Sequence, residues 1–129
     1  MHCKALFFDL DDTLYPKSTG LWNAIRDRMH TYMAELVDLP PDDIEALRQH
    51  YLDKYGATLR GLQIHYQIDT DQYLAYVHDL PLAEFIKPDP DLSRLLSTLP
   101  HKKYIFTNAD IQHARRVLDV LQMGEWYEQ

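Results

Sequence analysis

Two short apolar segments, each ending abruptly in polar residues, constrain the fold of this chain most strongly. Within residues 4–9, the stretch Ala5-Leu6-Phe7-Phe8 is apolar until Asp9, and residues 104–106 follow a basic run and end at Thr107. Such short apolar runs are typical of buried parallel strands. Residues 17–85, which lie between them, show apolar side chains at helical spacing and no strand signal. We therefore predict an α/β fold with parallel strands and a helical insert after the first strand.

Apolar spacing and capping residues give the expected helices. They begin after Ser18 or Thr19, within Pro40-Pro41-Asp42, after Gly61, near Asp69 or Thr70, within Pro88-Asp89-Pro90 and after Asp110. In the last of these helices, Ile111, Ala114, Val117, Leu118 and Leu121 are expected on one apolar face. Only two strands are evident. We expect a core domain of residues 1–16 and 86–129 and a helical domain of residues 17–85.

Composition excludes several classes of partner. The chain has 129 residues, 46% of them hydrophobic, and a formal net charge of −7. That acidic balance argues against a nucleic acid or an anionic membrane as partner. The sequence has one cysteine, and its N-terminal apolar run is too short for a signal peptide or a membrane span. We expect a soluble cytoplasmic protein.

The acidic residues after the first apolar segment are the first candidate site. Strand alternation places Asp9 and Asp11 on one side and Leu10 on the other. A divalent cation relieves the repulsion between two such carboxylates, and Mg²⁺ suits an oxygen-only site. One carboxylate can attack phosphorus while the other protonates the leaving oxygen. The alternative is that this segment is only a solvated acidic turn or a helix cap. We expect Asp12 to face away from the site and to serve the structure of the turn.

The second candidate site lies where the second strand meets a helix. The Thr107 hydroxyl and the free N–H groups of a helix start suit an anionic phosphate oxygen. The alternative is that Thr107 and Asn108 only cap the helix. Beside the acidic residues, we favour phosphate binding.

Two further residues are candidates for substrate contact. Arg60 lies between Gly56 and Gly61, in what we interpret as a loop that approaches a ligand closely. Tyr15 follows the acidic residues and either stacks on a base or packs in the core. The seven histidines show no metal-ligand spacing, and we interpret all of them as structural.

The sequence Asp9-Leu10-Asp11-Asp12-Thr13, together with Phe106-Thr107-Asn108, resembles motifs I and II of the haloacid dehalogenase (HAD) superfamily. Residues 15–18, 55–62 and 86–89 resemble its pyrimidine 5′-nucleotidase branch. The resemblance implies a Rossmannoid core with a helical cap after the first strand.

For function, the resemblance implies a Mg²⁺-dependent phosphomonoesterase. Asp9 would be the nucleophile and Asp11 the general acid/base, and the Asp9 carboxylate and the Asp11 backbone carbonyl would bind Mg²⁺. Thr107 and Asn108 would hold the phosphoryl group. The small-molecule substrate would be a pyrimidine nucleoside 5′-monophosphate, with a sugar phosphate or another metabolite phosphate as the alternative.

The same resemblance implies a later lysine and a later pair of acidic residues that this sequence does not contain before Gln129. We expect a truncated chain with weak activity. Completion by a second chain and a non-catalytic phosphate-binding module stay open as alternatives. An incomplete sheet leaves a pairable edge, so we also expect self-association. A response-regulator receiver domain would need strands within residues 17–85, where none is expected.

Overall fold

A computed structural model describes residues 4–11, 13–107, 110–123 and 127–128. The chain divides into two compact units, one formed by residues 1–22 and 81–129 and the other by residues 23–80. We call them unit 1 and unit 2. These boundaries lie a few residues from the expected ones, and the assignment of the units as catalytic core and cap stays a prediction. No helix within the described ranges has both the length and the apolar character needed to span a membrane.

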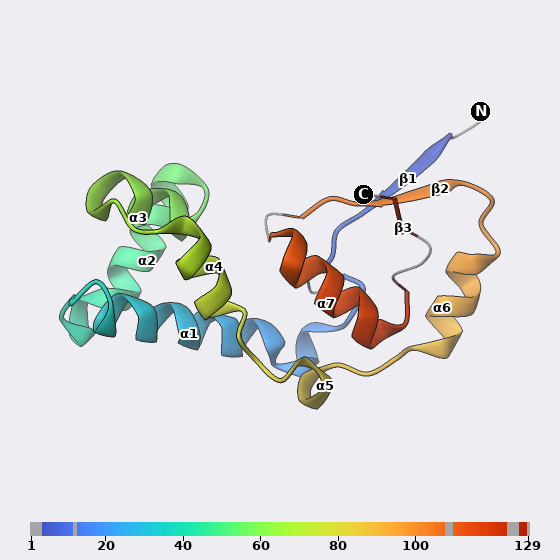
Figure 1. Cartoon of the computed structure of the whole chain (residues 1–129), viewed down its shortest axis with the longest axis horizontal. Helices are drawn as coiled ribbons and strands as arrows, with labels where there is room; N and C mark the ends of the chain where they lie inside the picture. The colour runs from blue at the N-terminus through green and yellow to red at the C-terminus, as the bar shows by residue number, and fades with distance from the viewer. Residues whose placement is uncertain (1–3, 12, 108–109, 124–126, 129) are drawn as a thin grey trace. The chain divides into compact units, whose positions relative to one another are not determined.

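Unit 1 contains a parallel sheet with the strand order β1-β2-β3 (Figure 1). The strands are β1 (Ala5–Phe8), β2 (Lys102–Ile105) and β3 (Tyr127–Glu128). In the pairing of β1 with β2, Phe8 lies opposite Ile105, and the N–H of Phe106 donates to the carbonyl of Phe8 at 2.8 Å. The predicted parallel α/β fold is therefore confirmed. Only two of these strands are evident in the sequence, because the two residues of β3 do not form an apolar run.

One face of this sheet is open to solvent. Phe7 is 69% exposed and its ring stacks on that of Tyr104 at a centroid distance of 5.1 Å. Phe106, just beyond β2, is 74% exposed. The expectation that the first strand is buried is thus wrong for the face that carries Phe7.

The helices of unit 1 are a 3₁₀ helix (Lys17–Thr19), α5 (Leu82–Phe85), α6 (Pro90–Ser97) and α7 (Ile111–Leu121). Helix α6 begins as predicted, with the Asp89 carboxylate accepting a hydrogen bond from the N–H of Leu92 at 3.0 Å. Helix α7 buries His113, Val117, Leu118 and Leu121. Ile111, expected on this face, is 64% exposed, so the buried face is rotated toward His113.

Helix α1 (Leu21–Glu35) begins in the last residues of the first segment of unit 1 and belongs to unit 2 from residue 23 on. Unit 2 adds α2 (Pro41–Tyr55), α3 (Thr58–Tyr66) and α4 (Thr70–Val77). These helices confirm the predicted helical stretch. Helix α3 starts earlier than expected and runs through Gly61, which packs against the ring of Tyr51. Gly56 ends α2 in the left-handed region, at φ 84°. The interpretation of Gly61 as a loop glycine is therefore wrong.

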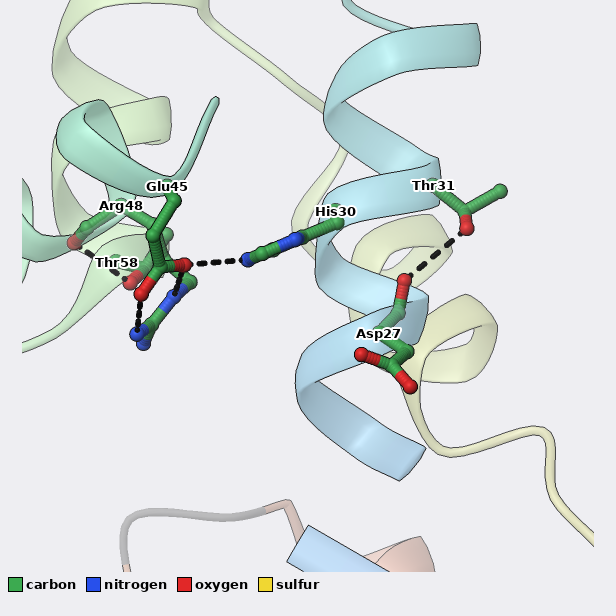
Figure 2. A network of polar contacts seen from close by, with 6 residues as sticks. All are labelled: Asp27, His30, Thr31, Glu45, Arg48 and Thr58. Atoms are coloured by element: carbon green, nitrogen blue, oxygen red, sulfur yellow. Dashed lines mark hydrogen bonds and ion pairs between the residues drawn. The ribbon is translucent and has the colours of Figure 1, made fainter. Parts of the chain in front are cut away.

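A polar network joins three helices of unit 2 (Figure 2). The Glu45 carboxylate accepts hydrogen bonds from Nε and Nη2 of Arg48, both at 2.9 Å, and lies 2.6 Å from Nε2 of His30. The Thr58 hydroxyl donates to the backbone carbonyl of Arg48 at 3.2 Å. The Arg48 hydrogen bonds lower the pKa of Glu45 to about 2, and they raise the pKa of the buried Arg48. The network ties α1 and α3 to α2.

Candidate active site

Asp9 is the first residue after β1, and its carboxylate is held by its own loop. Oδ1 accepts a hydrogen bond from the N–H of Leu10 at 2.9 Å, and Oδ2 accepts one from the Thr13 hydroxyl at 3.3 Å. The residue is exposed. An oriented and accessible carboxylate at the carboxyl end of a parallel strand can reach a ligand there.

A single turn after β1 determines which side chains of this loop are buried. The carbonyl of Leu10 accepts hydrogen bonds from the N–H groups of Thr13 and Leu14, at 3.3 and 3.1 Å. Leu10 and Leu14 are buried, and they anchor the turn in the core. Asp9 is exposed and the side chain of Asp11 is 20% exposed. Leu10 is buried as expected, whereas Asp9 and Asp11 differ in exposure, so their shared role in one site stays a prediction.

Asp11 is contacted by two side chains from different parts of unit 1. The Tyr15 hydroxyl donates to its Oδ1 at 2.5 Å, and Nε2 of His113 lies 3.0 Å from the same oxygen. Tyr15 is 3% exposed, so its ring packs in the core and does not present a face on which a base could stack. Of the two interpretations of Tyr15, core packing is the one that the structure bears out.

Sequence reasoning missed His113, which was grouped with the structural histidines. Its side chain is fully buried on α7, in line with Val117 and Leu121 at intervals of four residues. A histidine on the apolar face of a helix that directly follows the second strand is the signal that could have found it. The local pattern gave no partner for it, because Asp11 is 102 positions away.

The second candidate site is described only in part. Thr107 follows the last residue of β2 by two positions and is half-buried, at the same edge of the sheet as Asp9. Asn108 and Asp12 lie outside the described residues. The role of Thr107 and Asn108 in phosphate binding therefore stays a prediction.

Arg60 belongs to unit 2, within α3, and is not in a loop. It is exposed, and its Nη1 donates to Oε1 of Gln63, one turn along the helix, at 3.4 Å. The expected loop between two glycines is thus wrong. Contact between Arg60 and a substrate stays a prediction.

The pair Asp9 and Asp11 supplies only oxygen donors. Among the described residues, no three histidine, cysteine, aspartate or glutamate side chains gather as a metal site. An exposed aspartate carboxylate fits Mg²⁺, which keeps several waters and takes one or two carboxylates. The donors present are therefore chemically compatible with that ion.

Comparison with known proteins identifies the family to which this chain belongs. The chain belongs to the haloacid dehalogenase-like hydrolase family, whose model matches residues 3–129. Among curated proteins it is similar to Phosphate metabolism protein 8 of Saccharomyces cerevisiae, with 33% identity over 134 residues. The match covers 97% of this chain and 42% of the yeast protein. The expected superfamily is thereby confirmed.

Proposed function

We propose that the chain carries the phosphotransfer site of a Mg²⁺-dependent phosphomonoesterase that acts through an aspartyl-phosphate. The observation that carries the proposal is the contrast between Asp9 and Asp11. Asp9 is exposed and oriented by Leu10 and Thr13, as a nucleophile must be. Asp11 is largely buried and held by hydrogen bonds, as suits a group that moves a proton.

The reaction has two steps. A carboxylate oxygen of Asp9 attacks phosphorus, the bond from phosphorus to the ester oxygen breaks, and Asp11 gives its proton to the leaving alcohol. Asp11 then takes a proton from water, whose oxygen attacks the aspartyl-phosphate and releases inorganic phosphate. Asp9 returns as a carboxylate and Asp11 as an acid, so the cycle closes.

A metal ion and two hydrogen-bonding residues would assist this chemistry. The Asp9 carboxylate and the Asp11 backbone carbonyl would hold Mg²⁺, which neutralises the charge of the phosphoryl group during transfer. Thr107 and Asn108 would donate hydrogen bonds to the phosphoryl oxygens near the start of α7.

For the substrate we favour a pyrimidine nucleoside 5′-monophosphate. The resemblance of residues 55–62 and 86–89 to the pyrimidine 5′-nucleotidase branch supports this choice. The name of the yeast relative supports a role in phosphate metabolism more generally. Arg60 is our candidate for contact with the substrate, and a sugar phosphate remains the alternative substrate. The proposed location is the cytoplasm.

The chain spans less than half of its yeast relative. This supports the proposal that the lysine and the acidic pair implied by the family resemblance come from residues other than these 129. The chain by itself is then weakly active, because stabilisation of the transferring phosphoryl group is incomplete.

Phosphate release tests this function. UMP, CMP, a sugar phosphate and an aryl phosphate are each incubated with the chain in Mg²⁺ or in EDTA, with Asp9→Asn as the inactive variant. Asp79→Asn, an exposed aspartate of unit 2, is the matched control. We expect slow Mg²⁺-dependent release that only Asp9→Asn abolishes, fastest with UMP or CMP. Release unaffected by Asp9→Asn, or none from any ester, contradicts the proposal for this chain.

A further inference from the structure

Two buried side chains meet the carboxylate of Asp11 at one atom. Both the Tyr15 hydroxyl and Nε2 of His113 lie within hydrogen-bond distance of Oδ1. Tyr15 is 3% exposed and His113 is 1% exposed. Since an ionised carboxylate only accepts hydrogen bonds, Nε2 of His113 is the donor in this contact.

The fold brings these side chains together from opposite ends of the sequence. The turn closed on the carbonyl of Leu10 places Tyr15 one helical turn after Asp11. His113 is the third residue of α7, which starts shortly after β2. Parallel pairing of β1 with β2 puts the loop after β1 and the start of α7 at the same edge of the sheet.

Burial of a polar ring on this face of α7 has an energetic cost. Val117 and Leu121 continue the same face and are fully buried apolar residues. A leucine at position 113 would avoid the desolvation of a polar ring, which is unfavourable where no hydrogen bond compensates it. The hydrogen bond to Asp11 compensates for part of this desolvation. This contact gives a physical reason for a histidine, and not a leucine, at position 113.

We propose that Tyr15 and His113 are positioning residues that fix the Asp11 carboxylate for proton transfer to and from the reacting oxygens. The inference rests on the proposed function, in which Asp11 is the general acid/base. Two donors on Oδ1 stop the carboxylate from rotating. They also keep that oxygen as an acceptor, so the transferred proton is carried by Oδ2.

Two substrates with different leaving groups distinguish a positioning role from a general loss of structure. A nucleoside alkoxide needs a proton as it leaves, whereas dinitrophenolate does not. The ratio kcat/KM reports transition-state stabilisation from free enzyme and substrate. We therefore measure kcat/KM for UMP and for 2,4-dinitrophenyl phosphate in the full chain and in His113→Leu and Tyr15→Phe.

We expect each substitution to lower kcat/KM for UMP by about tenfold to a hundredfold, the usual effect of a misplaced catalytic group. The value for dinitrophenyl phosphate stays within about twofold, and the KM for UMP is unchanged. His113→Gln, which keeps a donor at the level of Nε2, recovers most of the UMP activity. Equal losses on both substrates, or no rescue by glutamine, overturn the inference.

A second readout does not depend on turnover. In the folded wild-type chain we expect an imidazole Hε2 resonance of His113 that is protected from solvent exchange, assigned by its absence in His113→Gln. The resonance disappears in Asp11→Ala. If it is missing from the wild type, or survives in Asp11→Ala, the positioning role is wrong. If the wild type turns over neither ester, the phosphatase proposal fails and this resonance alone decides whether His113 holds Asp11.

Discussion

The backbone of Gly61 in α3 packs against the ring of Tyr51 in α2, with no room for a β-carbon between them. Both residues are buried, and the contact sets how closely the two helices approach. We predict that Gly61→Ala destabilises the protein by about 1–3 kcal/mol, because a new methyl group overpacks this contact. Denaturant unfolding measures the change.

The control for Gly61→Ala is Gly56→Ala. A β-carbon at Gly56 meets no atom within 4 Å, but its φ of 84° is unfavourable for alanine, at a cost of about 1–2 kcal/mol. Adding Tyr51→Leu should relieve the loss at position 61 and leave the loss at position 56. Equal behaviour of both glycine variants in the Tyr51→Leu background would show that crowding is not the cause.

The Glu45 network gives unit 2 an acid-sensitive contribution to stability. The folded pKa of Glu45, about 2, lies below its ordinary value of 4.5. Its contribution is therefore present above pH 4.5 and is lost as the pH falls from 4.5 toward 2. At pH 7, Glu45→Gln should cost no more than about 1 kcal/mol, because the Glu45 side chain is 57% exposed.

Unfolding free energies of wild type and Glu45→Gln, measured between pH 7 and pH 2.5, check this prediction. The two curves should converge toward low pH. Glu84→Gln, an exposed glutamate of α5, is the matched control and should run parallel to the wild type. A constant difference between wild type and Glu45→Gln would contradict the role of the ionised carboxylate.

Tyr73 buries a hydroxyl that has no hydrogen-bond partner among the described residues. Its ring meets that of Tyr32 edge-on, at a centroid distance of 5.0 Å. We predict that Tyr73→Phe leaves stability unchanged or raises it by up to about 1 kcal/mol, because it keeps the ring and removes an uncompensated polar atom. Thermal unfolding tests this, and a loss above about 1 kcal/mol would contradict it.

The buried hydroxyl of Tyr73 also makes the stability of the fold depend on pH in alkaline solution. Burial raises the pKa of Tyr73 above 10, so its neutral form favours folding below pH 10 and this contribution is lost as the pH rises through the folded value. Tyr73→Phe should therefore lose less stability than the wild type between pH 9 and pH 11. Parallel losses in both proteins would assign the alkaline effect to other groups.

Lys103 is a buried cation at the amino end of β2. Its Nζ donates to the carbonyls of Leu99 and His101, at 3.0 and 3.3 Å, in the segment after α6. It lies at the opposite end of β2 from Thr107, so we assign it no role in phosphate binding. Lys103→Met keeps the apolar stem and should cost about 1–3 kcal/mol from the lost hydrogen bonds to a charged group. The exposed Lys102→Met should be near neutral, and equal losses would contradict this account.

Self-association stays a prediction of the incomplete sheet. The exposed rings of Phe7, in β1, and of Phe106, just beyond β2, favour self-association. Light scattering at increasing concentration should show a rising average mass. A monodisperse monomer at high concentration would contradict the prediction.

The sequence predicted those features that depend on neighbouring residues. The burial of Leu10 was expected from the apolar and polar pattern, although a turn after β1 rather than the strand produces it. The pairing of β1 with β2 follows from two apolar runs with a helical crossover. Features that depend on distant partners were missed. The sequence pattern places Gly61 in a loop, because local propensity does not reveal its packing partner Tyr51 on another helix.

The contact of His113 with Asp11 was missed for the same reason, because the two residues are far apart in the sequence. Hydrophobicity alone placed Ile111 on the buried face of α7, whereas the structure exposes Ile111 and turns His113 inward to Asp11. Tyr15 was a candidate for substrate stacking because it follows the acidic residues. The turn on Leu10 instead folds its hydroxyl back onto Asp11.

The most direct test of the central claim is to trap the phosphorylated aspartate. The chain is mixed with Mg²⁺ and a reactive aryl phosphate, quenched in acid, reduced with borohydride and mapped by peptide mass spectrometry. The account predicts conversion of Asp9 to homoserine, dependent on substrate and absent in Asp9→Asn. Modification of another carboxylate, or none during measurable turnover, would contradict an aspartyl-phosphate at Asp9.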